Sequence, residues 1–288
     1  MPYNRHFCVK VNPEMPSKSL FSLNFRYLPN ALLLAAAAML TPVRAIAWGT
    51  QGHEIVALIA AQELSAPARA QVTHLLGSTA MMVHQSNWAD EIRDQRRDTG
   101  RWHYVDIPLG APGYDARRDC PDRACVVAQI ENDQRILANR KLGDGARAEA
   151  LRFLIHFVAD VHQPLHAEDN DDKGGNQVRV TIGRERANLH RVWDADVVEV
   201  QGRDSRAAAD AILRSTSSAQ RHAWASGTPI QWANEAHALA RDQIYPPLAG
   251  RHDVRLPRDY AWRQAGLVRV QLAKAGLRLA WLLNSTLK

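Results

Sequence analysis

Hydrophobic residues recur every three to four positions through most of the chain after residue 50, which is the spacing of amphipathic helices. Helices are predicted over residues 53–64, 69–76, 81–97, 125–139, 147–160 and 259–283. No repeat, low-complexity tract or linker interrupts residues 48–288. The pattern therefore predicts a mainly α fold in one domain over 48–288.

Strand signal is confined to one short stretch. Residues 177–182 (QVRVTI) alternate and are β-branched, and they follow the turn residues Gly174, Gly175 and Asn176, so we expect a short β-hairpin there. The last predicted helix has one apolar stripe, with Arg263, Arg269, Lys274 and Arg278 elsewhere. Such a helix is typical of core packing, and a basic polar face also occurs on helices that lie on membranes.

The first 47 residues have the pattern of a secretory signal peptide. Arg26 precedes ten apolar residues, 31–40, and Ala45-Ile46-Ala47 is a small-x-small cleavage signature. A membrane anchor is the alternative, but a span needs roughly 20 apolar residues. We expect cleavage before Trp48, a secreted or periplasmic monomer, and no stable membrane association after the signal is removed.

Removal of residues 1–47 changes the charge and the cysteine count. It leaves 31 basic and 29 acidic residues, so the net charge falls from +6 to +2, which does not by itself argue for a polyanionic partner. Cys120 and Cys125 remain. In an oxidising compartment this pair predicts a disulfide, and a zinc knuckle is the alternative, although no further His or Cys lies close enough in sequence to complete it.

The densest chemical signal runs from His156 to Asp194. HFVAD puts His156 and Asp160 on one helical face, His166 follows, and NLHRVWD repeats the spacing with His190 and Asp194. Imidazoles and carboxylates are ligands that zinc accepts. Taken alone, these pairs are also typical of ion pairs on a helix surface.

Three upstream motifs strengthen the metal interpretation. They are WGTQGH at the predicted mature terminus, WAD ending at Asp90, and WHYVD with His103 and Asp106. Cleavage before Trp48 would expose an amine whose unperturbed pKa near 7.7 to 8.0 makes it an attainable nitrogen ligand. The Trp48 amine and carbonyl oxygen can then chelate one ion.

With these motifs in order, the mature chain resembles the zinc-dependent single-strand nucleases of the S1/P1 type. The motifs that carry the resemblance are WGxxGH, WADE with a nearby Arg, HYVD, HFxxDxxQPLH, GGN and NLHxxWD, from Trp48 to Asp194. The resemblance implies three zinc ions per chain. It assigns Asp90, His103, His156 and Asp160 to one ion, Trp48, His53 and the shared Asp160 to a second, and His166, His190 and Asp194 to a third.

The resemblance also implies the reaction, which is hydrolysis of single-stranded DNA and RNA to 5′-phosphate products, with 3′-nucleotidase activity on 3′-nucleotides. Asp160 would act in catalysis as the bridging ligand, and Arg93, expected on the same helix as Asp90, would face the phosphate. RDQRRD is also typical of a solvated charge run. Tyr104 and Asp106 would hold a nucleobase by stacking and hydrogen bonding, which requires an unpaired base.

Other interpretations remain open at this point. Asn176 is expected beside the base pocket, or in a plain hairpin turn. A zinc-dependent phospholipase C could use the same chemistry, and a base pocket at Tyr104 and Asp106 would argue against it. A structural zinc module would need only one closed set of four ligands. The six other histidines of the mature chain are expected to be structural or surface residues, namely His74, His84, His162, His222, His237 and His252.

Overall fold

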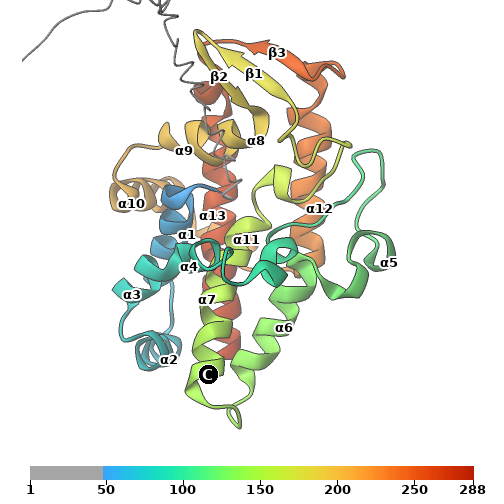
Figure 1. The fold of residues 1–288 in the computed structure, drawn as a ribbon. Helices are drawn as coiled ribbons and strands as arrows, with labels where there is room; N and C mark the ends of the chain where they lie inside the picture. Colours follow the sequence, from blue (N-terminus) through green and yellow to red (C-terminus); the bar gives the residue numbers. More distant parts are fainter. Residues whose placement is uncertain (1–47) are drawn as a thin grey trace, which may run out of the picture. The chain divides into compact units, whose positions relative to one another are not determined.

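Two long buried helices organise the described part of the chain. The structure, a computed structural model, describes residues 48–288, and the signal peptide predicted for residues 1–47 lies outside the described residues. Helices α7 (Asp144–Asp160) and α13 (Tyr260–Thr286) pack together, with α6 (Val126–Ala138) against α7 and α1 (Thr50–Gln62) against α13 (Figure 1). Within 48–288, no helix combines the length and hydrophobicity needed to cross a bilayer.

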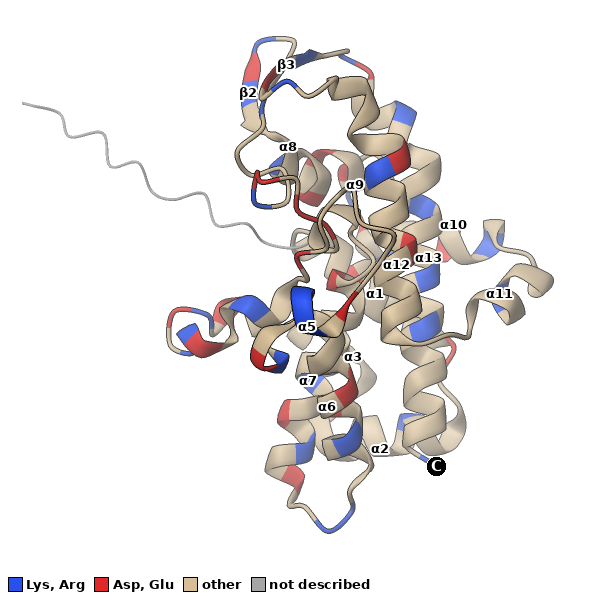
Figure 2. Ribbon diagram, turned by 90° about the vertical axis from the view of Figure 1, so that its right-hand side faces the viewer, with Lys and Arg blue, Asp and Glu red and all other residues tan. Residues whose placement is uncertain are grey.

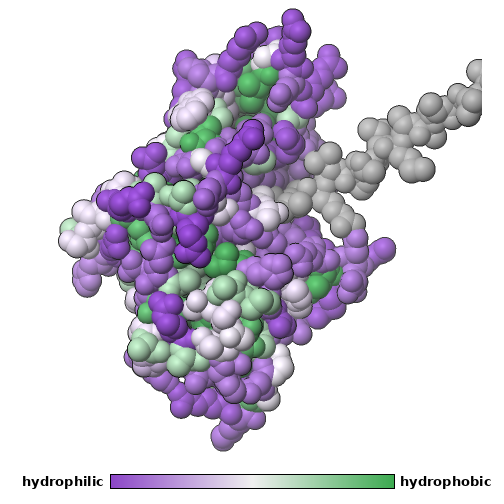
Figure 3. All heavy atoms as spheres, turned by 90° about the vertical axis from the view of Figure 1, so that its left-hand side faces the viewer, coloured by the Kyte–Doolittle hydropathy of each residue, from purple (hydrophilic) through white to green (hydrophobic). Residues whose placement is uncertain are grey.

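Shorter helices surround this core. The N-terminal half adds α2 (Ala66–Leu76), α3 (Thr79–His84), α4 (Trp88–Glu91) and α5 (Ala116–Asp119), with 3₁₀ turns at Gln85–Asn87, Arg97–His103, Pro121–Arg123 and Pro164–His166. The C-terminal half adds α8 (Leu189–Arg191), α9 (Val197–Glu199), α10 (Ser205–Ser215), α11 (Ser218–Trp224) and α12 (Pro229–Leu239), π-helical turns at Val192–Asp196 and Ala240–Ile244, and a 3₁₀ turn at Pro246–Leu248. The face that carries α2, α3 and α10 is largely hydrophilic with small hydrophobic patches (Figure 3). The mainly α prediction is confirmed.

The predicted hairpin forms, and a third strand joins it. Strands β1 (Arg179–Ile182) and β2 (Glu185–Asn188) pair antiparallel, and β3 (Asp253–Leu256) pairs parallel to β1, giving the order β2-β1-β3. Val180 and Val254 are register partners and both are buried. The sheet therefore has one face toward the core and ties residues near 180 to residues near 255.

The helix predicted over 81–97 is wrong in its extent. The chain leaves α3 at His84, makes a 3₁₀ turn, forms the short α4, and leaves helical structure after Glu91. Ser86 and Asn87 lie at the break, and such residues compete with helical hydrogen bonding. Arg93 consequently lies in a turn after α4 and not on the same helix as Asp90.

The last predicted helix is confirmed, with one correction. It runs from Tyr260 to Thr286 and its apolar stripe packs into the core. Arg278 is buried rather than on an outer basic face, because its guanidinium donates to both oxygens of Glu235 at 2.8 Å and to His162 Nε2 at 2.9 Å. Core packing is therefore the use that the structure gives this helix.

A glycine contact controls how closely α1 approaches α13. A Cβ built on Gly276 would lie 2.4 Å from Ile59 Cγ2 and 3.1 Å from the carbonyl oxygen of Val56. A Cβ on Gly266, in the same helix, would meet nothing within 4 Å. Only the first glycine is required for packing.

We expect Gly276→Ala to lower the free energy of unfolding by about 1–3 kcal/mol, since the added methyl overpacks the interface between α1 and α13. Gly266→Ala is the matched control and should raise it by about 0.5–1 kcal/mol through helix propensity. Urea unfolding midpoints test both. A Gly276→Ala protein as stable as the wild type would contradict this account of the interface.

Candidate metal centre and adjoining cavity

The last turn of α7 presents a buried histidine and a buried aspartate side by side. His156 and Asp160 are fully buried, and His156 Nε2 lies 3.3 Å from Asp160 Oδ2. The other nitrogen, His156 Nδ1, donates to the carbonyl oxygen of Ser86 at 2.8 Å. That hydrogen bond leaves Nε2 of the neutral ring as a lone-pair donor directed at the cluster.

Asp160 lies at the centre of a close cluster of side chains. Its Oδ1 is 3.4 Å from His53 Nε2, and its Oδ2 is 3.0 Å from His103 Nδ1. Asp90 completes the cluster, with Oδ1 3.7 Å from His103 Nδ1 and Oδ2 3.6 Å from His156 Nε2. The two oxygens of Asp160 thus face different histidines.

A second group forms where the chain leaves α7 and returns after the hairpin. His166 Nε2 and His190 Nε2 lie 3.1 Å apart, and His190 Nε2 is 3.5 Å from Asp194 Oδ2. Asp194 sits in the π-helical turn, a local irregularity that often occurs at functional sites. Gln163 Nε2 donates to Asp194 Oδ1 at 2.8 Å and fixes that carboxylate.

Backbone carbonyls fix both imidazoles of this group. His166 Nδ1 donates to the carbonyl oxygen of His103 at 2.8 Å, and His190 Nδ1 donates to that of Gly174 at 2.6 Å. Both Nε2 atoms therefore carry lone pairs, and the two lone pairs face each other across 3.1 Å. This arrangement repels unless a cation lies between them.

Burial disfavours the charged forms of these groups. Desolvation lowers the pKa of His103, His156 and His166, and lowers the pKa of His190 to about 4. It raises the pKa of Asp160 and Asp194, although Gln163 opposes it at Asp194. The lowered pKa values disfavour the imidazolium form, so the ring nitrogens of these histidines stay available as metal ligands.

Three sets of residues in the described chain place ligand atoms within 4.8 Å of one another. They are His53, His156 and Asp160; Asp90, His103 and His156; and His166, His190 and Asp194. Within these sets, the contacts between ligand atoms of neighbouring side chains measure 3.1 to 3.7 Å, and ligands of a tetrahedral zinc ion with bonds of 2.0–2.1 Å lie about 3.3 Å apart. The donor types and the spacing both fit zinc.

Trp48 lies just before α1 and beside this centre. Its side chain is fully buried, and a Cβ on Gly52 would lie 2.5 Å from Trp48 Cβ, so the WGTQGH glycine makes room for the indole. A Cβ on Gly49 would lie 3.1 Å from the carbonyl oxygen of Asp194. The backbone around Trp48 therefore approaches the segment that carries Asp194.

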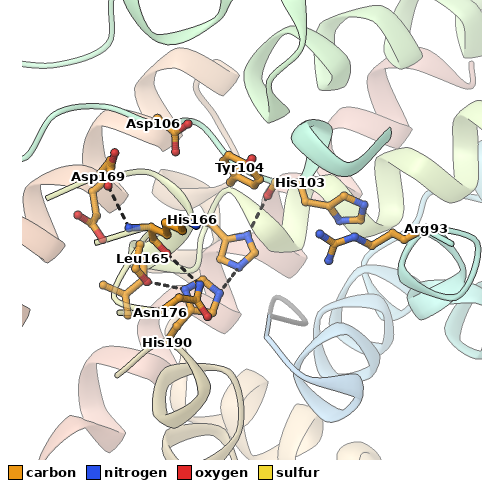
Figure 4. A pocket seen from close by; sticks show the side chains of 12 residues that line it. Arg93, His103, Tyr104, Asp106, Leu165, His166, Asp169, Asn176 and His190 are labelled. Carbon is orange, nitrogen blue, oxygen red and sulfur yellow. Dashed lines mark hydrogen bonds between the residues drawn. The ribbon is translucent and has the colours of Figure 1, made fainter. Parts of the chain in front are cut away.

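A cavity of about 410 Å³ opens beside both groups (Figure 4). Arg93 and His103 lie at one side of it, and Tyr104, Asp106 and Asn176 are among the residues that line the rest of its wall. Arg93 is half-buried and its guanidinium lies 3.3 Å from Asp90 Oδ1. The residues predicted for phosphate and base contacts are thus gathered around one opening.

Burial shifts the pKa values of the residues that are expected to contact the nucleobase. Burial, reinforced by the nearby Asp169, raises the pKa of Asp106 to about 6, and burial also raises the pKa of Tyr104. Asn176 Nδ2 donates to the carbonyl oxygen of Lys173 at 2.9 Å, so its amide nitrogen holds the loop. Asp106 consequently accepts hydrogen bonds at both of its oxygens above about pH 6 and becomes a carboxylic acid with one O–H donor below it.

Sequence reasoning missed the residues that support the centre. Tyr245 Oη is 2.8 Å from Glu168 Oε1 and 2.9 Å from each oxygen of the buried Asp172. Asp172 Oδ1 in turn accepts from the amide of Gly175 at 2.6 Å, which fixes the loop that holds His190. The acidic run at residues 168–172 (EDNDD) indicates carboxylates in this segment. Their contact with Tyr245 forms only when the chain folds, so the sequence does not predict it.

The predicted disulfide between Cys120 and Cys125 is present. It closes the loop before α6, and the first residue of that helix, Val126, donates its amide to the carbonyl oxygen of Tyr104 at 3.0 Å.

Two of the other histidines, His162 and His237, are structural as expected. His162 forms a hydrogen bond with the carbonyl oxygen of Val158 at 2.7 Å, and His237 forms one with that of Pro108 at 3.1 Å.

Several groups of buried histidines and aspartates beside an open cavity are typical of hydrolases that use more than one metal ion. The chain belongs to the S1/P1 nuclease family, which matches residues 48–288. This family is zinc-dependent in general, and nuclease activity is the activity that the family membership supports.

Individual relatives agree with this assignment. The chain is 30% identical over 281 residues to Nuclease S1 of Aspergillus oryzae, covering 88% of this chain and 97% of that protein. It is 31% identical over 262 residues to Endonuclease 2 of Arabidopsis thaliana, covering 82% and 89%. It is 31% identical over 264 residues to Nuclease P1 of Penicillium citrinum, covering 82% and 97%.

Gly174 offers a test of the support around His190. It has φ +60°, and a Cβ there would lie 2.4 Å from the carbonyl oxygen of Leu165. We expect Gly174→Ala to displace the carbonyl that orients His190 and to weaken metal binding at that group by about tenfold or more. Metal content after dialysis against a dilute chelator measures this loss.

Gly183→Ala is the matched control. Gly183 has φ +63°, but its Cβ would approach no atom closer than Arg258 Nε at 3.7 Å. Both variants carry the same backbone strain, so equal metal content in the two would show that the Gly174 carbonyl does not support the group.

Proposed function

We propose that this chain is a secreted phosphodiesterase with three zinc ions that hydrolyses single-stranded DNA and RNA. Its products would carry 5′-phosphate and 3′-hydroxyl ends, and it would also act on 3′-nucleotides. One observation carries the proposal. The Nε2 atoms of the buried His166 and His190 lie 3.1 Å apart with their lone pairs facing each other, beside a cavity lined by Tyr104 and Asp106.

The proposed ligand assignment follows the spatial groups. Asp90, His103, His156 and Asp160 would hold one zinc ion. His53, Asp160 and the amine and carbonyl of a mature Trp48 would hold a second, and His166, His190 and Asp194 a third. A bridging role for Asp160 is supported by its two oxygens, which face His53 on one side and His103 and His156 on the other.

Zinc ions bound there would supply a water nucleophile at neutral pH and neutralise charge on the phosphate. Around them, this chain's residues perform separate tasks. The backbone carbonyls of Ser86, His103 and Gly174 keep the imidazoles in one tautomer and orientation. Arg93, at the edge of the cavity, would direct its guanidinium at the phosphate as negative charge accumulates.

Binding of an unpaired base would follow from the cavity wall. The Tyr104 ring offers a face for stacking, Asp106 accepts hydrogen bonds from a base edge, and Asn176 adds a polar group at the mouth. Bases in a duplex are not available for such stacking, which is the physical source of the single-strand preference. Lys and Arg alternate with Asp and Glu along the ribbon in the view of Figure 2, so recognition would depend on the cavity rather than on a basic stripe.

Maturation would complete the centre. The proposed cleavage of residues 1–47 creates the amine at Trp48, and export to an oxidising compartment agrees with the disulfide between Cys120 and Cys125. The buried indole and the approach of Gly49 to Asp194 support a fixed position for this new terminus.

Two forms of the protein test the proposal directly, one beginning at Trp48 and one that keeps a few residues before it. We expect the first to contain about three zinc ions and to cleave single-stranded DNA and RNA, with activity lost to a chelator and restored by zinc. The second should hold less zinc and turn over more slowly, because its amide nitrogen cannot act as a ligand. Elemental analysis and nuclease assays measure both, and hydrolysis of a phosphatidylcholine analogue without nuclease activity would favour a phospholipase C instead.

A second prediction concerns pH. As the pH falls through about 6, Asp106 gains a proton, loses its negative charge and can no longer accept hydrogen bonds from a base at both of its oxygens. The ratio of wild-type kcat/KM to that of Asp106→Asn on a dinucleoside monophosphate should therefore be about tenfold above pH 7 and approach one at pH 5. A ratio that stays constant over this range would show that the ionised Asp106 does not contact the base. A phosphodiester is used because it does not itself titrate in this range.

A further inference from the structure

Arg93 lies in the wall of two cavities. The first is the base cavity, where Arg93 stands at the opposite end from Asp106 (Figure 4). The second has a volume of about 360 Å³ and is lined by residues of α1, the turn at Gln85–Asn87 and α4, together with Arg93. Asp90, whose carboxylate contacts His103 and His156, also lines the second cavity, so this cavity borders the metal centre.

We propose that the second cavity binds the nucleoside on the far side of the scissile phosphate, the one that departs with the 5′-phosphate. The proposal rests on the proposed function. Suppose that the scissile phosphate contacts Arg93 and that one nucleoside of the substrate fills the cavity of Tyr104 and Asp106. The substrate strand on the other side of the phosphate must then continue past Arg93, and the second cavity, which also begins at Arg93, is the space available to it.

Asn87 gives the second cavity a group that can recognise a base. The residue is 8% exposed, and its Oδ1 is buried without a hydrogen-bond partner among residues 48–288. Nδ2, by contrast, is near the carbonyl oxygen of Thr50 at 3.4 Å. An unsatisfied buried carboxamide oxygen is costly, and only contacts of 3.4 Å from Nδ2 hold this carboxamide in place. A small turn of the side chain toward the cavity would let an N–H group on a base satisfy the oxygen.

His84 gives the same cavity a flat ring. It is the last residue of α3 and is exposed, so its face is open to a ligand. Imidazole rings stack on unpaired bases as other aromatic rings do. An acceptor and a stacking surface in one cavity match the requirements of a nucleobase.

The charge of the cavity wall favours a nucleoside over a second phosphate group of the substrate. Besides Arg93, the wall carries the carboxylates of Glu54, Asp90 and Glu91. Glu54 Oε2 accepts a hydrogen bond from Ser205 Oγ at 2.6 Å, which keeps this carboxylate in place. Such a wall repels a second phosphate but accepts hydrogen bonds from sugar hydroxyls and base amino groups. The cavity therefore takes the neutral part of the nucleotide.

The test compares two phosphodiesters with the same leaving nucleoside. One is a dinucleoside monophosphate, and the other is a nucleoside 3′-(methyl phosphate), in which methyl replaces the second nucleoside. We expect the wild type to prefer the dinucleotide in kcat/KM by about tenfold. His84→Ala and Asn87→Ala should each reduce this preference severalfold and leave the methyl ester within about twofold of wild type.

His222→Ala, which removes an exposed histidine outside this cavity, is the matched control and should keep the full preference. Zinc content is measured in each variant, because Asn87 neighbours Ser86. Equal loss on both substrates, or an unchanged preference in both cavity variants, would overturn the inference while the nuclease function stands. A wild type that hydrolyses neither diester would overturn the proposed function itself, and this inference with it.

Discussion

The centre depends on one kind of contact, the hydrogen bond from imidazole Nδ1 to a backbone carbonyl. The carbonyls of Ser86, His103 and Gly174 each hold one ring, so the buried Nε2 atoms of these rings face the neighbouring ligand groups. Each of these carbonyls comes from an irregular segment, since a carbonyl inside a helix is already used by its own ladder. The broken helix near residue 86, the 3₁₀ turn before Tyr104 and the glycine loop are therefore what orients these rings.

Burial of the site residues also requires a well-packed core around them. Burying several imidazoles and carboxylates costs stability unless cations are bound, and the long, well-packed α7 and α13 offset that cost. The small sheet has a different task. Because β3 pairs with β1, it anchors the strand pair that leads into His190, and Tyr260 Oη accepts from Trp193 Nε1 at 3.2 Å beside Asp194.

The sequence predicted the elements with strong periodicity and the motifs with fixed spacing. α1, α6, α7 and α13 agree with their predicted ranges to within a few residues, and the hairpin was found. Helices α10, α11 and α12 were missed although Asp204, Ser217 and Thr228 cap them. For α10 the cap and a clear amphipathic pattern were both present in the sequence, whereas α11 has only seven residues and buries none of them. Strand β3 was missed because four residues whose pairing partner lies over 70 positions away leave no local pattern.

For the site, spacing indicated which histidines and aspartates could meet, since residues four apart share a helix face. It could not indicate what orients them: Gln163, Asp172 and Tyr245 act through contacts made only after folding. Gly49 lies against the backbone of Asp194, so the start of the domain and a residue nearly 150 positions later must both be present before the centre closes. In a chain that emerges N-terminus first, the contact of Gly49 with Asp194 therefore forms only after the segment of Asp194 has appeared, although the residues from His53 to Asp160 can gather earlier.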